Sequence, residues 1–295
     1  MQVKNMRILF IGIGEMGSGM AGNILTKNSS LTIWNRTVPK PHVDRLMERG
    51  ALFAHDLKQA AGESDFICFN LTSDDAVNAV AAGIAEYVRP GTVIMDFSTI
   101  SPDSANRLSQ GFAEKGSCFL DCPVSGGAEG AAKGALTIMV GGDSDAYQKA
   151  MPILEMCGAN IQYMGESGLG QKAKLINQLL AWVNQSAVCE AMLLAEKSGI
   201  DLSSLYQVLE TAWGRSWMLE RSVKQYIIPR EYDSSASIEL ICKDFAILER
   251  IAGQADYDIP ITRSAKEWYD GAMKEGYAKK DPAIIIELMR DNPTK

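Results

Sequence analysis

The segment whose residue types and spacing most clearly indicate a chemical role is a glycine pattern near the amino terminus. It reads G-x-G-x-x-G and consists of Gly12, Ile13, Gly14, Glu15, Met16 and Gly17. An apolar run, RILFI, precedes it, and an amphipathic pattern follows it. Between a strand and a helix, the first glycine permits the tight turn and the second lets a pyrophosphate approach the backbone, while the third lets helix and strand pack closely. The helix amino terminus then faces the phosphates. The pattern predicts a dinucleotide site.

The end of the second expected strand indicates which dinucleotide binds. An NAD site usually carries Asp or Glu about 20 residues beyond the first glycine, where the carboxylate accepts from the ribose hydroxyls. Here that stretch holds Asn35, Arg36 and Thr37, and the next acid is Asp44. Arg36 offers a planar fork of donors and a fixed charge, which suits a 2′-phosphate, and its two neighbours can add neutral hydrogen bonds. The alternative is an arginine in a solvent-exposed turn. The pattern favours NADP.

A lysine and two amides interrupt an otherwise apolar helical pattern in the second half of the chain. Lys174, Asn177 and Gln178 are spaced i, i+3 and i+4, so they share one helix face, whereas Lys172 points elsewhere and is expected to be solvated. Two glycines just before the lysine place it in the first turns, near the positive end of the helix dipole. That field and partial burial favour the neutral amine, which suits a general acid or base. The alternative is an ordinary surface charge.

A third motif combines a hydroxyl with two glycines. Ser125, Gly126 and Gly127 follow an apolar run that ends at Asp121. Adjacent glycines expose consecutive backbone N–H groups, which form a concavity for an oxyanion such as a carboxylate. The alternative is a turn without a ligand.

The spacing of apolar runs predicts the elements that position these motifs. Strands and helical patterns alternate through the first half of the chain, which is typical of a doubly wound, mostly parallel sheet of the Rossmann type. Strands are expected at 7–12, 31–35, 51–54, 65–70, 92–96, 118–121, 137–140 and 161–163, and helices at 15–27, 41–49, 76–88, 102–115 and 143–156.

The pattern changes after residue 165, where the segment GESGLG interrupts the chain and no convincing strand follows. Helices are expected at 171–197, 202–212, 217–225, 238–255, 261–275 and 283–290. We therefore predict an α/β fold with two domains: an NADP-binding Rossmann domain at 1–165, and an all-helical substrate and oligomerisation domain at 166–295 that begins with a long interdomain helix.

Composition excludes several classes of function. The net charge of −7 over 295 residues argues against nucleic acid or an anionic membrane as the main partner, because both require a basic surface. No apolar run is long enough for a signal sequence or a membrane span, so a cytoplasmic protein is expected. The six cysteines form no metal-binding pattern and are expected to be buried thiols, so no metal site is predicted. His42 and His55 lie in polar stretches and are expected to be surface residues.

Four ordered motifs resemble those of one enzyme family. They are GIGEMGSGMAGNI from Gly12, DCPVSGG from Asp121 with its continuation AEGAAKGALTIMVGG, GLGQKAKLINQ from Gly168, and the triplet Lys243-Asp244-Phe245. In this order they are similar to the β-hydroxyacid dehydrogenases, which include 3-hydroxyisobutyrate dehydrogenases and the tartronate semialdehyde and glyoxylate/succinic semialdehyde reductases. The resemblance covers essentially the whole chain.

The resemblance implies a role for each matching residue. Lys174 would be the catalytic acid and base, and Asn177 would position the substrate beside it, with Gln178 standing where many relatives have a second Asn. The Ser125 motif would hold the substrate carboxylate. The remaining residues would contact NADP or line its cleft, and they are Asn70, Leu71, Thr72, Thr99 and Lys243. For Lys243, an ion pair with Asp244 or Glu239 is a real alternative. The family also implies a homodimer or homotetramer.

One segment departs from the commonest family pattern. Trp213 and Trp217 flank Gly214, Arg215 and Ser216, a segment more similar to that of four-carbon sugar-acid dehydrogenases than to that of the isobutyrate enzymes. We expect both tryptophans in the core, and we regard Arg215 and Arg221 as either substrate-binding or plain surface charges.

The expected reaction is hydride transfer between NADPH and a small carboxylate-bearing aldehyde, keto acid or 3-hydroxy acid. Two alternatives stay open. An imine reductase shares the fold and cofactor but usually lacks the lysine. A catalytically inactive NADP-binding module would tend to lose the lysine or the Ser-Gly-Gly turn, and this chain has both. A 6-phosphogluconate dehydrogenase would need a much longer helical domain.

Overall fold

The computed structural model describes residues 6–28, 30–234 and 236–291. The chain packs as two compact units, residues 1–174 and 175–295. The break falls inside helix α8 (Leu169–Lys197), which therefore contributes to both units. The functional division expected at residue 165 stays a prediction.

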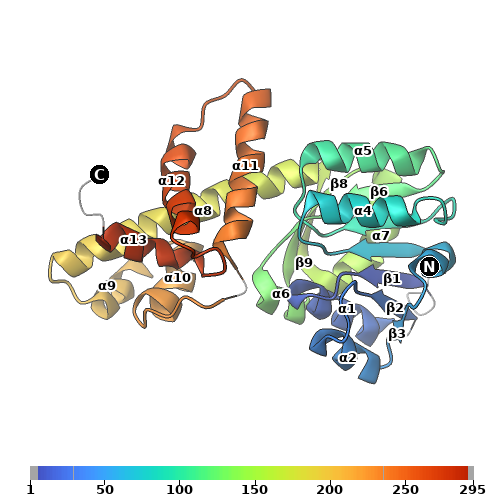
Figure 1. The fold of residues 1–295 in the computed structure, drawn as a ribbon, viewed down its shortest axis with the longest axis horizontal. Helices are drawn as coiled ribbons and strands as arrows, with labels where there is room; N and C mark the ends of the chain where they lie inside the picture. The colour runs from blue at the N-terminus through green and yellow to red at the C-terminus, as the bar shows by residue number, and fades with distance from the viewer. Residues whose placement is uncertain (1–5, 29, 235, 292–295) are drawn as a thin grey trace. The chain divides into compact units, whose positions relative to one another are not determined.

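A sheet forms the centre of the first unit, with the strand order β3-β2-β1-β4-β5-β6-β8-β7 and β9 beside β8 (Figure 1). Its strands from β3 to β6 are parallel, β8 runs antiparallel to β6 and β7, and β9 is parallel to β8. This confirms the predicted doubly wound, mostly parallel sheet. The strand bounds are β1 Ile8–Ile11, β2 Leu31–Trp34, β3 Leu52–Phe53, β4 Phe66–Phe69, β5 Val93–Asp96, β6 Cys118–Asp121, β7 Val124–Ser125, β8 Leu136–Gly141 and β9 Gly158–Gly165.

Helices bury both faces of this sheet, and the alternation of side chains in β1 separates the two cores. Ile8 and Phe10 pack with one set of helices, whereas Leu9 and Ile11 pack with the other. Strands buried on both faces need apolar residues at nearly every position, which is why they stand out as apolar runs. The first set is α1 (Glu15–Lys27), α2 (Pro41–Glu48), α6 (Gly127–Lys133) and α7 (Ser144–Cys157). The second set is α3 (Leu57–Glu63), α4 (Asp74–Ile84) and α5 (Pro102–Ala113).

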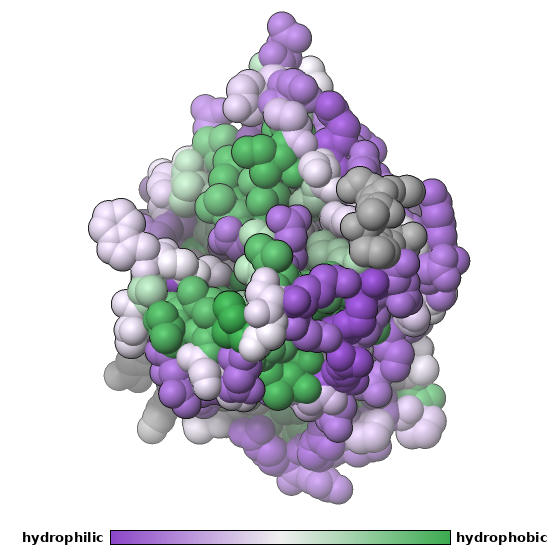
Figure 2. All heavy atoms as spheres, turned by 90° about the vertical axis from the view of Figure 1, so that its left-hand side faces the viewer, coloured by the Kyte–Doolittle hydropathy of each residue, from purple (hydrophilic) through white to green (hydrophobic). Residues whose placement is uncertain are grey.

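All regular secondary structure among the described residues of the second unit is helical. After α8 come α9 (Leu202–Leu209), α10 (Trp217–Ser222) with a π-helical turn at Val223–Ile227, α11 (Ile238–Gln254), α12 (Pro260–Lys274), a 3₁₀ turn at Pro282–Ile284 and α13 (Ile285–Asp291). Phe245, Tyr269 and Met192 lie in its core. Figure 2 faces the side that carries α9 and α13 in Figure 1, and it shows apolar residues gathered at the surface.

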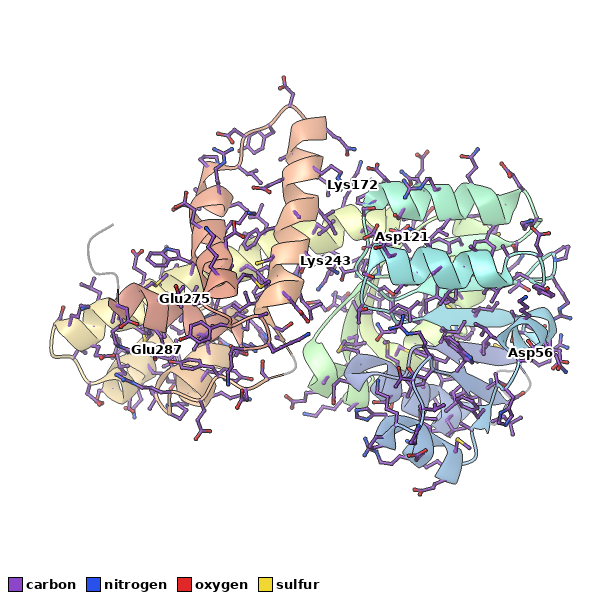
Figure 3. All side chains as sticks on the ribbon, viewed as in Figure 1. Asp56, Asp121, Lys172, Lys243, Glu275 and Glu287 are labelled. Carbon is purple, nitrogen blue, oxygen red and sulfur yellow. The ribbon has the colours of Figure 1, made fainter. Side chains whose placement is uncertain are left out.

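Several helices begin with an acidic or hydroxyl cap. Asp56, labelled in Figure 3, accepts hydrogen bonds from the Lys58 and Gln59 amides at 2.9 and 3.2 Å at the start of α3. Such a cap satisfies amides that have no partner within the helix and places a negative charge at the positive end of the dipole. Asp56 is exposed, whereas Ala61 of the same helix is buried in the core.

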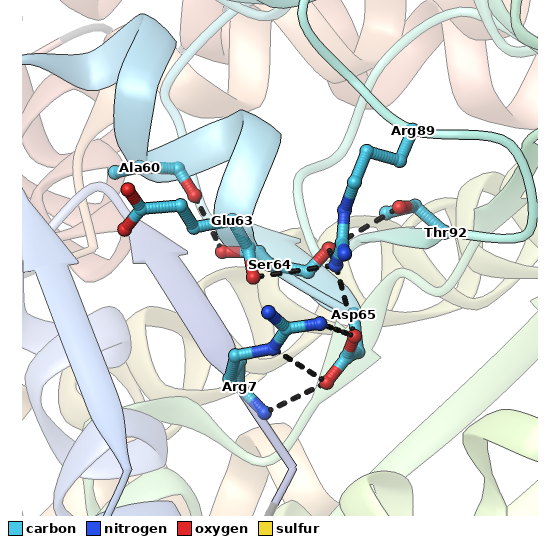
Figure 4. A network of polar contacts seen from close by, with 7 residues as sticks. All are labelled: Arg7, Ala60, Glu63, Ser64, Asp65, Arg89 and Thr92. Atoms are coloured by element: carbon cyan, nitrogen blue, oxygen red, sulfur yellow. Dashed lines mark hydrogen bonds and ion pairs between the residues drawn. The ribbon is translucent and has the colours of Figure 1, made fainter.

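A polar network holds the amino ends of three strands together (Figure 4). Asp65, just before β4, forms ion pairs with Arg7 at 2.6 Å and Arg89 at 3.0 Å. Arg89 and Thr92 both donate to the Ser64 carbonyl, at 3.0 and 3.2 Å. This network lies at the edge of the sheet opposite to the carboxyl ends that carry the predicted motifs, so it stabilises the unit without occupying the candidate site.

Candidate active site

The glycine pattern lies at the carboxyl end of β1, and each of its three glycines has a distinct setting. Gly12 has φ +97°, and a Cβ there would lie 2.2 Å from the Asn70 carbonyl oxygen. A Cβ on Gly17 would lie 2.0 Å from the Gly12 oxygen, so α1 can pack on β1 only without a side chain at that position. Nothing lies within 4 Å of the corresponding position on Gly14, the residue that caps α1. The open space over Gly14 and the helix start beside it fit the pyrophosphate of a dinucleotide.

The turn after β2 contains one side chain that is hydrogen-bonded within the turn and one that is exposed. Asn35 accepts from the Ile13 amide at 2.9 Å and donates to the Thr37 oxygen at 2.7 Å, so it ties this turn to the glycine loop. Arg36 and Thr37 are exposed, and Arg36 has no hydrogen bond or ion pair with any residue that the structure describes. The guanidinium is therefore available to an anion.

His42 is not the plain surface residue expected from its polar surroundings. It is half-buried on α2 and lies 3.0 Å from a carboxylate oxygen of Glu15, the fourth residue of the glycine pattern, while Arg45 contacts its other ring nitrogen. The prediction was wrong because His42 and Glu15 are 27 residues apart, and only the packing of α1 on α2 brings them together.

The loops after β4 and β5 extend the same edge of the sheet. The Leu71 amide donates to the Ser98 hydroxyl at 2.8 Å, which joins the two loops. Asn70 and Thr99 are half-buried, whereas Thr72 is exposed. The structure thus brings the residues predicted from the first, fourth and fifth strands to one carboxyl edge.

The Ser-Gly-Gly motif connects two elements that the sequence did not predict, β7 and α6. Ser125 pairs with Thr137 of β8, and both following glycines have positive φ, +136° at Gly126 and +65° at Gly127. Both conformations strongly favour glycine. Helix α6 then packs closely on α1, because a Cβ on Gly19 would lie 2.8 Å from the Ala131 backbone. The motif is therefore held beside the helix that starts at the dinucleotide loop.

Lys174 lies in the second turn of α8 and is buried, with 7% of its surface exposed. Lys172, labelled in Figure 3, is exposed, as the helical spacing predicts. Two buried groups hold the helix start. Asp121 accepts from the Gly168 and Gln171 amides, both at 2.8 Å. The Gln171 side chain donates to the Ser98 oxygen at 2.9 Å and accepts from the Ile100 amide at 3.1 Å. Neither Asp121 nor Gln171 was a predicted site residue.

Asp96 and Asp121 form a buried acidic pair at the ends of β5 and β6. They are direct register partners in the two parallel strands. Asp96 Oδ1 accepts from the Ser98 amide at 2.9 Å, while Oδ2 has no partner among the described residues. Burial raises the pKa of Asp96 to about 7, and the nearby charges of Asp121 and Asp74 add to this. Burial also raises the pKa of Asp121, although its amide donors oppose the shift.

In the helical unit, the predicted residues of α8 and α11 lie in one polar group. Gln178 Nε2 donates to Asp244 Oδ2 at 2.7 Å, and Asn177 Nδ2 donates to Gln178 Oε1 at 3.2 Å. Lys243, labelled in Figure 3, forms an ion pair with Asp244 at 3.6 Å, which is one of the two pairings considered as an alternative to cofactor binding. Asp244 thus joins residues predicted separately.

The expectation for the tryptophans was wrong. Trp213 is fully exposed and Trp217 is 78% exposed. Two other residues of this region are ion-paired within the unit: Arg215 with Glu220, and Arg221 with the buried Asp281. Polar and glycine neighbours in the sequence Trp-Gly-Arg-Ser-Trp make a turn, and such a turn offers no apolar face to cover an indole.

No cluster of His, Cys, Asp and Glu suited to a metal ion occurs among the described residues. In the same part of the chain, no helix is long and apolar enough to cross a membrane. The six cysteines are free thiols.

Comparison with known proteins supports the interpretation of the glycine loop as a dinucleotide site and the family resemblance of the ordered motifs. Residues 7–165 match the family model described as the NAD binding domain of 6-phosphogluconate dehydrogenase. Residues 168–289 match the one described as NAD-binding of NADP-dependent 3-hydroxyisobutyrate dehydrogenase. The chain belongs to the β-hydroxyacid dehydrogenase family. It is accordingly an NAD(P)-dependent hydroxyacid dehydrogenase.

Members of this family with different names are similar to the chain over nearly its full length. An L-threonate dehydrogenase of Haemophilus influenzae is 32% identical over 98% of this chain and 96% of its own. An NAD-dependent L-serine dehydrogenase of Pseudomonas aeruginosa is also 32% identical, over 98% of this chain and 99% of its own. The crystal structure of a 3-hydroxyisobutyrate dehydrogenase from Salmonella typhimurium has a TM-score of 0.88 at 30% identity, covering 96% of this chain and 100% of that one. An imine reductase from Myxococcus stipitatus, at 18% identity, shares the fold alone.

Proposed function

We propose that the chain is an NADPH-dependent dehydrogenase of a small carboxylate-bearing substrate, with Lys174 as its general acid and base. The observation that carries this proposal is the placement of Lys174. The lysine is buried on a helix whose first turn is bonded to the end of β6 and to both neighbours of Thr99. Buried lysines are rare, and a lysine held at the carboxyl edge of a dinucleotide-binding sheet is well placed to serve the reaction.

In the proposed reaction each motif has one task. Bound NADPH supplies the hydride from C4 of its nicotinamide. Ser125 and the amides of Gly126 and Gly127 hold the substrate carboxylate, and Asn177 orients the reacting end. As the carbonyl carbon accepts the hydride, the Lys174 ammonium gives a proton from Nζ to the developing alkoxide, and the neutral amine regains a proton from solvent. In the oxidative direction the same amine accepts the hydroxyl proton.

Arg36 supports NADPH as the cofactor. It is exposed beside the glycine loop, has no ion pair with the described residues, and has no acid next to it in the turn. Asn35 already forms hydrogen bonds with Ile13 and Thr37. We therefore propose that it stabilises the turn and also contacts the ribose. The proposed cofactor contacts also include Asn70, Leu71 and Thr72. Lys243 is a weaker candidate because Asp244 pairs with it.

Replacement of Lys174 tests the proposal directly. Lys174→Ala should lower turnover by about 10² to 10⁴, the usual effect of losing a general acid, with NADPH binding nearly intact. Turnover is measured with NADPH on glyoxylate, succinic semialdehyde, tartronate semialdehyde and oxidised four-carbon sugar acids, and binding by titration of NADPH fluorescence. Lys172→Ala, two residues away and exposed, is the matched control. A Lys174→Ala enzyme that keeps most of its activity on the best substrate contradicts the mechanism.

The substrate panel also separates the proposed activity from the alternatives. Within the panel we place four-carbon sugar acids first, because L-threonate dehydrogenases are among the similar proteins and the Trp213–Trp217 segment resembles theirs. Reduction of a cyclic imine, with no turnover of any carboxylate substrate, would favour an imine reductase. NADPH binding without turnover of either class would favour an inactive binding module.

We also propose that the chain forms a homodimer or homotetramer through its helical unit. An apolar groove of about 430 Å³ lies between α8, α12 and α13, and Ile261 at its rim is 72% exposed. A groove lined mostly by apolar side chains, with an exposed isoleucine at its rim, is typical of a surface that binds another protein. The molar mass in solution, measured by light scattering, tests this; a monomer at micromolar concentration contradicts it.

A further inference from the structure

Asp121 connects the end of β6 to the start of α8. It is fully buried, and its two oxygens each accept one backbone amide from the start of α8, Gly168 and Gln171, at 2.8 Å. A buried carboxylate is costly unless its oxygens are hydrogen-bonded, and the amino end of a helix supplies both donors and a favourable dipole. These paired bonds therefore fix the first turn of α8 to the end of β6.

Gln171 attaches the same turn to a second element. Its side chain is completely buried, donates to the Ser98 oxygen at 2.9 Å and accepts from the Ile100 amide at 3.1 Å. These are the residues on either side of Thr99. Two hydrogen bonds through Gln171 thus hold the first turn of α8 to the loop after β5, and two through Asp121 hold it to the end of β6.

Two glycines allow the backbone to approach Asp121 closely. A Cβ on Gly170 would lie 2.5 Å from the Met139 oxygen and 2.7 Å from Asp121 Oδ2. A Cβ on Gly141, at the end of β8, would lie 2.7 Å from Asp121 Oδ1. The helix start and the end of β8 therefore approach the carboxylate closely from two sides. A side chain at either glycine would therefore displace the helix start or the end of β8 from the carboxylate.

Lys174 lies three residues after Gln171 on this helix, so it shares a face with Gln171 and moves with the first turn. We propose that Asp121 and Gln171 are positioning residues, which set the place of the Lys174 amine relative to the Thr99 loop. The inference rests on the proposed role of Lys174. A misplacement of about 1 Å at a reacting group can lower a rate by about 10². Asp121 and Gln171 with their four hydrogen bonds, here called the clamp, should therefore affect turnover far more than cofactor binding.

Two variants separate the two halves of the clamp. Asp121→Asn keeps the shape of the side chain but points an NH₂ group at one of the two amide donors. Gln171→Met keeps the length of the side chain and both hydrogen bonds from backbone amides to Asp121. It removes the side-chain hydrogen bonds to Ser98 and Ile100. We expect each variant to lower kcat about tenfold to a hundredfold with NADPH and to change the Kd for NADPH less than threefold. Asp56→Asn alters the corresponding cap on α3 and should change neither.

A double-variant cycle with Lys174→Ala gives the deciding measurement, because a purely structural role would not depend on the lysine. If the clamp acts through Lys174, adding Asp121→Asn or Gln171→Met to Lys174→Ala should leave the residual kcat within about twofold. A further tenfold fall in the double variants would overturn the positioning role while leaving Lys174 as the acid. So would an unchanged kcat in the folded single variants, or a loss of NADPH affinity equal to the loss of kcat.

Two other outcomes are also decisive. If Lys174→Ala alone keeps its activity, the proposed function fails and the positioning role fails with it. If one clamp variant does not fold, as judged by thermal unfolding, the other decides. If neither folds, Asp121 and Gln171 belong to the fold, and the proposal is wrong.

Discussion

At the scale of single residues, Arg36 makes the most specific prediction. A charge-assisted bond from its guanidinium to a 2′-phosphate contributes about 1.5–3 kcal/mol, or roughly a ten- to hundredfold preference. We expect kcat/KM to be at least tenfold higher with NADPH than with NADH. Arg36→Ala should remove most of this difference, and Arg36→Lys, which keeps the charge but loses the planar fork, should retain part of it. Steady-state rates with both cofactors measure the ratios.

The contacts of Asn35 decide which variant could invert this preference. Asp at position 35 would still accept from the Ile13 amide, but it would lose the donor to the Thr37 oxygen. Asn35→Asp combined with Arg36→Ala should therefore favour NADH at some cost in stability, since the acid repels the 2′-phosphate and accepts from free hydroxyls. Equal use of NADH by the unmodified enzyme would refute the role of Arg36 and leave the dehydrogenase assignment standing.

Residues with chemistry of their own could be predicted from the sequence, whereas residues that act through the fold could not. Lys174 stood out because a charged side chain interrupts an apolar helix. Asp121 and Asp96 each end an apolar run, as many strand-end residues do, and nothing local shows that they are register partners. The same holds for Gln171, whose partners Ser98 and Ile100 are more than 70 residues away.

At the scale of elements, the turn between β7 and α6 carries the carboxylate-binding proposal. Gly126 has φ +136°, and a Cβ there would lie 3.1 Å from the Leu136 side chain. Gly126→Val introduces a β-branched side chain into a conformation that favours glycine, and it crowds the two amides. We expect KM for the carboxylate substrate to rise at least tenfold while the Kd for NADPH changes little.

Gly91→Val provides the matched control for that variant. Gly91 also has positive φ, +85°, but it lies in an open turn near the amino end of β5, far from the carboxyl edge. It should lower the thermal unfolding temperature without raising KM. If Gly126→Val weakens NADPH binding as much as substrate binding, the motif serves the cofactor or the fold instead.

Elements were predictable where burial imposed a pattern on enough residues. The expected helix at 15–27 and the expected strand at 118–121 agree with α1 and β6, because one has a clear apolar stripe and the other is buried on both faces. Short elements were missed: β7 has two residues, and α3 and α6 have seven each. Seven residues of Gly, Ala and polar type show no period, so α6 forms only because it packs against α1. The expected helix at 217–225 gives way to π-helix after Ser222.

At the scale of the whole molecule, buried acids link stability to pH. Most carboxylates of a folded protein keep or lower their pKa, and acid then destabilises the fold. Asp65 follows this rule, since its hydrogen bonds to Arg7 lower its pKa; its contribution is present above pH 4 and is lost on acidification. Asp96 behaves in the opposite way. The pKa of about 7 in the folded state lies well above the unfolded value of about 3.9.

Between these two values the native state binds a proton at Asp96 that the unfolded state does not, so stability should fall as pH rises from about 4 to 7. The shift corresponds to roughly 4 kcal/mol as an upper limit for one buried group. Asp96→Asn is neutral at every pH and keeps the acceptor for the Ser98 amide. It should raise the unfolding temperature at pH 8 relative to the unmodified protein. It should also reduce the decrease in unfolding temperature between pH 5 and pH 8, although Asp121 maintains part of that decrease.

Asp65→Asn should lower the unfolding temperature by a similar amount at both pH values, because Asp65 is ionised throughout this range. Thermal unfolding of the three proteins across the range measures each slope, and an unchanged slope in Asp96→Asn would show that Asp96 is already ionised at pH 5.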